Sequence, residues 1–264
     1  MTQVLTDDHV SFAGELADVA RTLFRNRVDE RPDISIKSDD SPVTPMDKQI
    51  EHELRKMIRQ RFPEHGILGE EHGAENANAD HVWVIDPIDG TLAFIAGVPV
   101  YGVLIGLAHE RKPMLGVIEH PATGDRWTGG LSIGTKRNGQ PVSVRQCGEL
   151  GKAFLTTSNT DFMTADERHA FEALKGETQF TLYGASCFAY GLLASGRTDI
   201  AVDCGFDIFD ALAPAAVVEG AGGKVTDWDG AEIHLGWRGR LAATGDPNLH
   251  KRTLERLNST GLLD

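Results

Sequence analysis

A stripe of hydrophobic residues at helical spacing runs through positions 7–29, which predicts an amphipathic helix. The polar segment that follows, R-P-D-I-S-I-K-S-D-D-S-P, contains two prolines and three aspartates and predicts a strand–turn or a loop. Thr44 and Pro45 then predict the start of a second helix, because threonine is a good N-cap residue and proline fits the first helical position. The apolar face of this helix comprises Ile50, Leu54, Met57 and Ile58.

From residue 66 the pattern changes to short apolar runs separated by turns. The runs G-I-L-G, V-W-V-I-D, Y-G-V-L-I-G-L-A-H and P-M-L-G-V-I-E-H predict strands. The pair Asn138-Gly139 predicts a hairpin, because both residues tolerate the positive φ angles that tight hairpin turns require. Residues 66–146 are therefore expected to form a mostly antiparallel sheet that packs against the first two helices.

The second half of the chain alternates strands with helices, which predicts an α/β layer. We expect an N-terminal α+β unit over 1–150 and a C-terminal α/β unit over 151–264, with a soft boundary near 147–153. The predicted strands are A-F-L-T-T-S, T-Q-F-T-L-Y, D-I-A-V-D and L-A-A-T-G, and the predicted helices cover 164–175, 185–195, 210–221 and 247–258.

Composition narrows the class of protein. Hydrophobic residues make up 41% and charged residues 25% of the 264 positions, which is ordinary for a globular protein and argues against disorder. The formal net charge of −13 disfavours nucleic acid and anionic membranes as partners. No signal peptide or membrane-spanning segment is predicted. The three cysteines, which are odd in number and widely spaced, predict a reducing, cytoplasmic location: Cys147, Cys187 and Cys204.

The segment W-V-I-D-P-I-D-G-T at 83–91 carries the most chemical information. Its apolar residues predict a strand that ends at Asp86, because Pro87 lacks the N–H needed to continue the ladder. Asp86 and Asp89 would repel each other at the end of a buried strand unless a cation lay between them. Carboxylate oxygens are hard ligands, which suits Mg²⁺.

Backbone groups of the same segment add to this site. The carbonyl of Ile88 is a plausible third oxygen ligand, and the N–H groups of Gly90 and Thr91 are placed to hold a phosphate at a helix start. From spacing alone, however, D-x-x-D-G-T fits a capped turn as well as a metal site.

Two further acidic sites strengthen the metal hypothesis. Glu70 and Glu71 follow a short strand, although paired glutamates commonly form a solvated turn. Asp210 is expected to be the N-cap residue of the helix that it opens, and an N-cap carboxylate can also face a cleft.

These segments together resemble the inositol monophosphatase family. The resemblance rests on G-E-E (69–71), W-V-I-D-P-I-D-G-T (83–91) and F-D-A-L-A…E-G-A-G-G (209–223), and it extends over nearly the whole chain. It implies an α+β and α/β layered αβαβα sandwich of the inositol monophosphatase and fructose-1,6-bisphosphatase type. It also implies a Mg²⁺-dependent, lithium-sensitive phosphomonoesterase that binds two or three ions and is commonly a homodimer.

The resemblance also assigns roles residue by residue. Thr91 and its partner Asp47 would position the attacking water, with Glu70 holding it through a metal, and Lys37 would lie in a lid segment. As a surface residue, Lys37 would by itself be expected to be only solvated. The implied metal ligands are Glu70, Asp86, the Ile88 carbonyl, Asp89 and Asp210.

Within the family the chain is most similar to the histidinol-phosphate phosphatase branch, on the evidence of 89–130 and 183–203. E-H-P-x-x-G-x-R-W at 119–127 is typical of that branch, which belongs to histidine biosynthesis. Ser186 stands where the branch has an acidic residue, and Asp203 stands where it has a glutamate. Asp207 is an extra carboxylate that either compensates in the substrate pocket or is only an exposed residue at a helix start.

The expected reaction is in-line attack of water on phosphorus, without a covalent enzyme intermediate. The expected substrate is a small phosphorylated alcohol, histidinol phosphate in the first instance. Inositol 1-phosphate, or a nucleotide such as a 3′-phosphoadenosine phosphate, is the alternative substrate. A metal-binding regulatory or scaffold protein is the non-enzymatic alternative, although it predicts damage to the carboxylate set, which is complete here.

Overall fold

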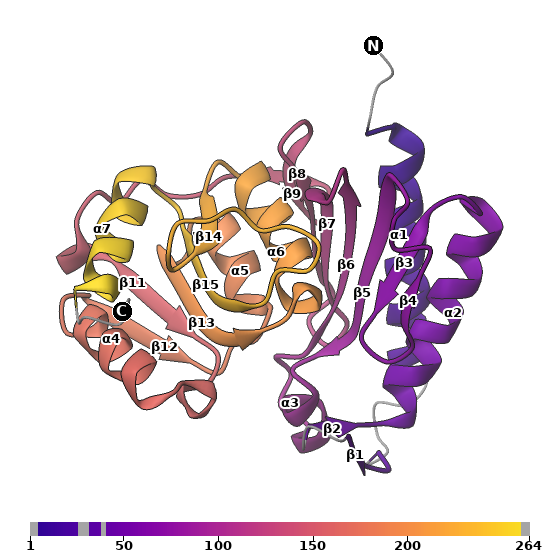
Figure 1. Cartoon of the computed structure of the whole chain (residues 1–264), viewed down its shortest axis with the longest axis horizontal. Coiled ribbons are helices and arrows are strands. Elements are labelled where there is room, and N and C mark those ends of the chain that lie inside the picture. The colour runs from indigo at the N-terminus through magenta and orange to yellow at the C-terminus, as the bar shows by residue number, and fades with distance from the viewer. Residues whose placement is uncertain (1–4, 26–31, 38–40, 260–264) are drawn as a thin grey trace.

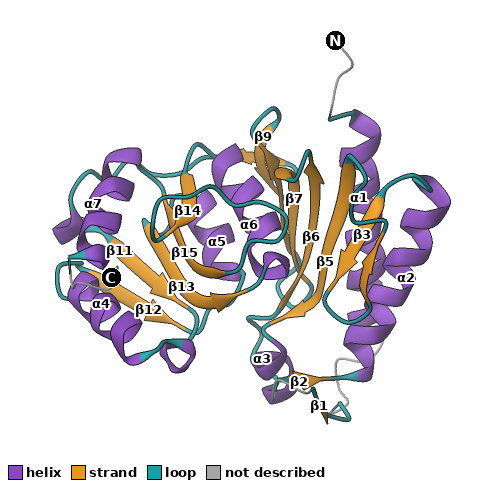
Figure 2. Ribbon diagram, in the orientation of Figure 1, coloured by secondary structure: helices purple, strands orange, loops and turns teal. Residues whose placement is uncertain are grey.

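Helices and sheets alternate in five layers (Figures 1 and 2). The structure is a computed structural model that describes residues 5–25, 32–37 and 41–259. Within these residues the order is two helices, an eight-stranded sheet, two buried helices, a five-stranded sheet and two outer helices. This αβαβα arrangement confirms the expected fold class. None of the described helices is long and apolar enough to cross a membrane.

The first outer layer consists of α1 (Asp7–Arg25) and α2 (Pro45–Arg61). The described part of α1 confirms the predicted helix, and residues 26–31 lie outside the described part of the chain. Thr44 is the N-cap residue of α2, as predicted, and in the structure it also forms a capping box with Asp47. The helices bury one face against the first sheet through Phe12, Leu16, Phe24, Ile50, Leu54 and Ile58.

The first sheet is antiparallel except for one pair of strands. From one edge to the other it comprises β10 (Gln140–Val142), β9 (Gly134–Arg137), β8 (Asp125–Gly130), β7 (Lys112–His120), β6 (Gly102–His109), β5 (His81–Asp89), β3 (Gly66–Gly69) and β4 (Gly73–Glu75). The parallel pair is β3 and β5. The predicted hairpin joins β9 and β10, with φ angles of 49° at Asn138 and 79° at Gly139.

The middle layer is formed by α5 (Phe188–Ala194) and α6 (Ile208–Gly220). Both helices lie between the two sheets, and therefore α6 is apolar on almost every side rather than amphipathic. Close packing requires small residues here. A Cβ atom at Gly191 of α5 would lie 2.7 Å from the ring of Trp127, and one at Gly116 of β7 would lie 2.2 Å from the backbone of α6.

The second sheet combines parallel and antiparallel strands. In spatial order it comprises β12 (Phe180–Tyr183), β11 (Phe154–Thr157), β13 (Ile200–Phe206), β15 (Gly239–Thr244) and β14 (Lys224–Asp227). The pairs that β11 makes are parallel and those of β15 are antiparallel. The hydrophobic pattern predicted four of these five strands and did not predict β14. The outer helices α4 (Ala165–Lys175) and α7 (Pro247–Asn258) cover this sheet.

Five short elements complete the chain. The unit boundary expected near 147–153 coincides with the connection between the two sheets, and the division into units 1–150 and 151–264 remains a prediction. The short elements are β1 (Ser35–Ile36), β2 (Pro42–Val43), α3 (Thr91–Ala96) and the 3₁₀ turns η1 (Leu150–Lys152) and η2 (Thr160–Phe162).

Candidate active site

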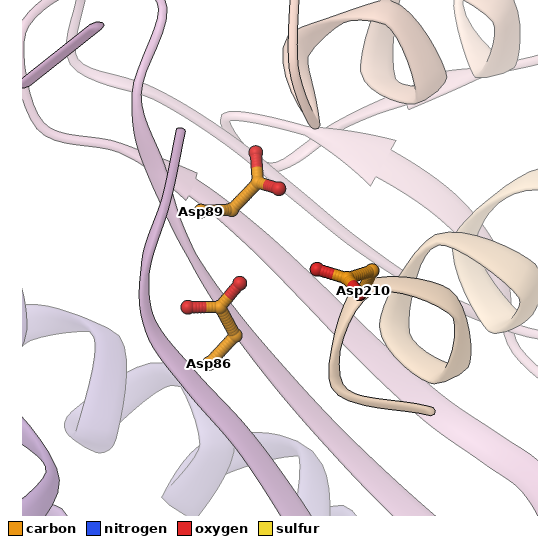
Figure 3. Close-up of side chains that lie close together, drawn as sticks. All are labelled: Asp86, Asp89 and Asp210. Atoms are coloured by element: carbon orange, nitrogen blue, oxygen red, sulfur yellow. The ribbon is translucent and has the colours of Figure 1, made fainter. Parts of the chain in front are cut away.

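Three aspartates from distant parts of the sequence meet where β5 ends against α6. Asp86 and Asp89 lie on β5, and Asp210 lies in the first turn of α6. Carboxylate oxygens of the three residues all lie within 4.8 Å of one another. Figure 3 shows the three side chains pointing into the same space. Packing of α6 on the first sheet therefore assembles the cluster that the sequence suggested in two separate pieces.

A bulge in β5 brings Asp86 and Asp89 together. Residues three apart on a regular strand point to opposite faces of the sheet. Here Asp86 pairs with Leu104 and Asp89 pairs with Gly102, so three steps along β5 match two steps along β6. The expectation that the strand ends at Asp86 is therefore wrong: β5 continues through Pro87 to Asp89, and the bulge accommodates the missing N–H.

Backbone N–H groups hold the carboxylates of Asp86 and Asp89. Asp86 Oδ1 accepts a hydrogen bond of 2.9 Å from the N–H of Ile88. Asp89 Oδ2 accepts one of 2.6 Å from the N–H of Cys187 at the start of α5. The Cys187 contact has no signal in the sequence, because it depends on how α5 packs against the first sheet. Burial raises the pKa of the Cys187 thiol well above its usual value, which argues against a nucleophilic role for Cys187.

The electrostatics of the cluster favour a cation. Burial raises the pKa of Asp86 well above its usual range, and the charges of Glu70, Asp89 and Asp210 raise it further. The pKa of Asp210 is likewise raised, first by burial and then by the charge of Asp89. A divalent cation bound by these oxygens would relieve the repulsion, and the hard-oxygen donor set fits Mg²⁺. The residues present therefore fit the metal that the resemblance implies.

Glu70 approaches the cluster from the end of β3. Its charge contributes to the raised pKa of Asp86, so it lies alongside the three aspartates without belonging to their tight group. Lys37 Nζ lies 2.8 Å from Glu70 Oε1 and 2.5 Å from Glu71 Oε1. Lys37 is thus more than a solvated surface residue. Although burial by itself would lower the pKa of Lys37, its hydrogen bonds to both glutamates raise it. Residues 38–40 of the expected lid lie outside the described residues.

Thr91 and Asp47 lie near the site but are not joined as expected. The hydroxyl of Thr91 donates to the Ile88 carbonyl at 3.0 Å. The carboxylate of Asp47 accepts from the hydroxyl of Thr44 at 2.6 Å and from its N–H at 2.8 Å. Among the hydrogen bonds of the described residues, none links Asp47 to Thr91 directly. A water between the two would satisfy both, since each retains a free acceptor lone pair.

Gly90 and Ser186 lie against each other beside the aspartates. Gly90 has a φ of 80°, and a Cβ atom there would lie 2.7 Å from Ser186 Oγ. Ser186 itself has a φ of 45° in the loop that leads into α5. Ser186, which stands where the histidinol-phosphate phosphatase branch has an acidic residue, therefore borders the N–H groups of Gly90 and Thr91 that are predicted to bind phosphate.

Asp203 lies deeper than a pocket-lining residue would. Its carboxylate accepts from the Tyr190 hydroxyl and the Ser158 N–H, both at 2.6 Å, and from the Thr157 hydroxyl at 3.3 Å. Burial raises the pKa of Asp203 to about 6. These contacts leave the Asp203 carboxylate little capacity to bind a substrate directly.

The start of α6 differs from the expectation. Asp207, not Asp210, is the N-cap residue, and its side chain accepts from the N–H of Ile208 at 3.0 Å. Asp210 occupies the third helical position, and its carboxylate accepts from the N–H of Asp207 at 2.7 Å. This capping box aims Asp210 toward Asp86 and Asp89. Asp207 also pairs with Arg238 at 3.0 Å, which partly neutralises its charge.

Comparison with known proteins identifies the family. The model of the inositol monophosphatase family matches residues 5–261. The chain is 38% identical to a bifunctional phosphatase IMPL2, chloroplastic, of Arabidopsis thaliana, over 95% of this chain and 75% of that protein. It is 33% identical to a histidinol-phosphatase of Chlorobaculum parvum, over 89% of this chain and 91% of that protein.

The solved structures agree. An inositol monophosphatase from Zymomonas mobilis superposes with a TM-score of 0.87 at 35% identity, covering 95% of this chain and 98% of that chain. The carboxylate cluster, the layered fold and these relatives lead to one conclusion. The chain belongs to the inositol monophosphatase family, whose members depend on metal ions, and it is a phosphatase that hydrolyses phosphoric monoesters.

Proposed function

We propose that this phosphatase hydrolyses histidinol phosphate to histidinol and phosphate in a Mg²⁺-dependent reaction of histidine biosynthesis. The convergence of Asp86, Asp89 and Asp210 supports the metal-dependent chemistry. The segment E-H-P-x-x-G-x-R-W and the relatives named histidinol-phosphatase support the choice of alcohol. Relatives named inositol monophosphatase make inositol 1-phosphate the alternative substrate.

The carboxylates would hold two or three Mg²⁺ ions. Asp86, Asp89, Asp210 and Glu70 would serve as side-chain ligands, and the Ile88 carbonyl would add a backbone oxygen. When bound, the ions supply positive charge that offsets the phosphate dianion and activates water for attack. The lithium sensitivity implied by the family is part of the same proposal.

The residues of the chain would then orient the reactants. The N–H groups of Gly90 and Thr91 at the start of α3 would bind phosphate oxygens. The hydroxyl of Thr91 donates to the Ile88 carbonyl, so its lone pairs are available to accept a hydrogen bond from the attacking water. Asp47, held by its capping box, would accept a hydrogen bond from the other O–H of that water.

The alcohol of the substrate would lie toward Ser186, with Asp203 and Asp207 further back. Histidinol phosphate carries an ammonium group and an imidazole, which favour acidic partners. Because Asp207 is paired with Arg238 and Asp203 is engaged by Tyr190, Ser186 is the position at which a change would alter the pocket most directly.

A phosphate-release assay with three substrates tests this proposal. Histidinol phosphate should give a higher kcat/KM than inositol 1-phosphate or 3′-phosphoadenosine 5′-phosphate. A higher kcat/KM for inositol 1-phosphate would make that compound the substrate and would leave the proposed metal chemistry unchanged. Absence of Mg²⁺-dependent phosphate release from any substrate would favour a regulatory or scaffold role.

We also propose that the phosphatase is a cytoplasmic homodimer. The free, buried cysteines are in keeping with a reducing compartment. The edge strand β12 carries Phe180, Leu182 and Tyr183, which are 40% to 57% exposed, and such a strand is suited to a protein interface. Sedimentation velocity distinguishes a dimer from a monomer.

A further inference from the structure

Glu51 of α2 is a completely buried carboxylate that the predicted chemistry does not use. It lies beside the apolar stripe of α2 and is 0% exposed. Its Oε2 atom accepts a hydrogen bond of 2.7 Å from the N–H of Glu71, and its Oε1 atom accepts one of 3.1 Å from the N–H of His72. A charged group in such a place needs a structural reason, because desolvation of a carboxylate is costly.

Arg55, one turn later on α2, balances this charge. Its Nε atom donates to Glu51 Oε1 at 2.7 Å. The guanidinium also donates to the carbonyl of Gly73, the first residue of β4. The two side chains of α2 therefore bind residues 71–73, the part of the turn between β3 and β4 that leads into β4.

The Glu51 carboxylate lies very close to the backbone of Gly69 at the start of this turn. A Cβ atom at Gly69 would lie 2.0 Å from Glu51 Oε1, so a side chain there would displace the carboxylate. The glycine of the G-E-E motif is thus explained by Glu51 rather than by a turn conformation, because the φ of Gly69 is not positive.

Glu70 lies between the close approach at Gly69 and the backbone N–H groups that Glu51 binds. Its own N–H donates to the carbonyl of Ile85 on β5 at 3.2 Å, and the next two N–H groups donate to Glu51. The backbone of Glu70 is therefore tied on one side to the strand that carries Asp86 and on the other side to α2. Its side chain, which Lys37 contacts at 2.8 Å, approaches the aspartate cluster.

We propose that Glu51, held by Arg55, is a positioning residue that fixes Glu70 at the metal site. This proposal rests on the proposed function, in which Glu70 is a metal ligand. Asp86, Asp89 and Asp210 are held instead by backbone N–H groups of β5, of the start of α5 and of the start of α6, so loss of Glu51 weakens the Glu70 contribution and spares theirs. Partners behind a metal ligand typically change metal affinity by about 10–100-fold.

The test compares Glu51→Gln with Glu53→Gln in the full chain. Glutamine keeps the size of Glu51 but turns an amide donor toward backbone N–H groups. Glu53 lies on the same helix with a side chain that is 40% exposed, and it is the matched control. Calorimetric titration with Mg²⁺ should show about 10-fold weaker binding for Glu51→Gln and unchanged binding for Glu53→Gln. Phosphate release by Glu51→Gln should need correspondingly more Mg²⁺, with kcat largely recovered at saturation.

Two further variants separate positioning from mere stability. Glu51→Gln leaves the buried Arg55 with the longer ion pair of 3.6 Å to the partly exposed Glu75, and this loss of its close partner is itself destabilising. Glu51→Gln/Arg55→Met removes that buried charge, and it should still bind Mg²⁺ weakly if Glu51 positions Glu70. In the Glu70→Gln background, Glu51→Gln should cause no additional loss of affinity, because the two residues act through one contact.

Three outcomes would overturn the proposal. Wild-type Mg²⁺ affinity in folded Glu51→Gln or in the double variant, despite a lower melting temperature, would make the role of Glu51 structural only. Losses that add in the Glu70→Gln background would mean that Glu51 acts elsewhere. Failure of the wild-type chain to bind Mg²⁺ at all would overturn the proposed function as well, and this distinguishes the two failures.

Discussion

Asp86→Asn tests the aspartate cluster with little change of shape. The carbonyl oxygen of asparagine can keep the hydrogen bond that Asp86 Oδ1 accepts from the N–H of Ile88. The substitution removes one of three charges whose oxygens lie within 4.8 Å of one another. We expect activity to be lost, because the remaining carboxylates bind Mg²⁺ less well. We also expect the metal-free protein to become more stable.

The size of this gain in the free energy of unfolding follows from the distances between the carboxylates. Two unit charges 4.8 Å apart repel by about 3.5 kcal/mol at an effective dielectric constant of about 20. Proton uptake already relieves part of this repulsion, since burial and neighbouring charges raise the pKa of Asp86. A gain of about 1–3 kcal/mol remains, and each kcal/mol raises the melting temperature by about 2–4 °C in a chain of this size.

The gain should depend on pH. A carboxyl whose folded-state pKa is raised contributes no destabilisation below its unfolded pKa and costs stability as the pH rises through the folded value. The variant and the wild type should therefore melt together near pH 4 and separate as the pH increases. Added Mg²⁺ should reverse the order, because a ligand at 100 times its Kd stabilises the wild type by about 2.7 kcal/mol.

Thermal unfolding in chelator from pH 4 to 8.5, repeated with Mg²⁺, provides the assay. A variant that is less stable than the wild type in chelator throughout this range would contradict the electrostatic argument. Full activity of Asp86→Asn at saturating Mg²⁺ would contradict the assignment of Asp86 as a ligand.

Three other changes test other parts of the site and fold. Thr91→Val should lower kcat by about 10²–10⁴-fold while calorimetry shows nearly unchanged Mg²⁺ affinity, and a parallel loss of both would give Thr91 a different role. Ser186→Asp should lower the KM for histidinol phosphate at least about 10-fold and leave the KM for inositol 1-phosphate unchanged. An unchanged KM for histidinol phosphate would mean that residue 186 only packs. The pKa of His65 is lowered to about 4 by burial and by the charges of His81 and His9, so the folded protein should lose about 1–2 kcal/mol as the pH falls from 6.5 to 4. His65→Asn keeps an acceptor for the Trp83 indole N–H, and in urea unfolding its free energy of unfolding should fall by about that much less between pH 6.5 and pH 4.

Local chemistry predicted much of the fold. The start of α2 follows from Thr44 and Pro45, whose capping and φ preferences act within one turn. The hairpin at Asn138-Gly139 follows from two residues that accept positive φ. The continuation of β5 through Pro87 could not be predicted in this way, because the bulge depends on pairing with β6.

The candidate site was predictable where it is local in sequence. Asp86 and Asp89 stand out because they close a buried apolar run. The cap of α6 is ambiguous in D-I-F-D, since either aspartate can begin the helix, and tertiary packing selects Asp207. Glu51 was missed although it forms an i, i+4 pair with Arg55 next to an apolar stripe, because its target is a turn beyond its own helix.

The most direct test of the central claim is phosphate release from p-nitrophenyl phosphate as Mg²⁺ is titrated into chelator-treated protein. The wild type should be inactive in chelator and recover fully with Mg²⁺, while Asp210→Asn should stay inactive over the same range and remain folded by circular dichroism. Hydrolysis that persists in chelator, or that Asp210→Asn retains, would contradict the assignment of these aspartates to a catalytic metal site.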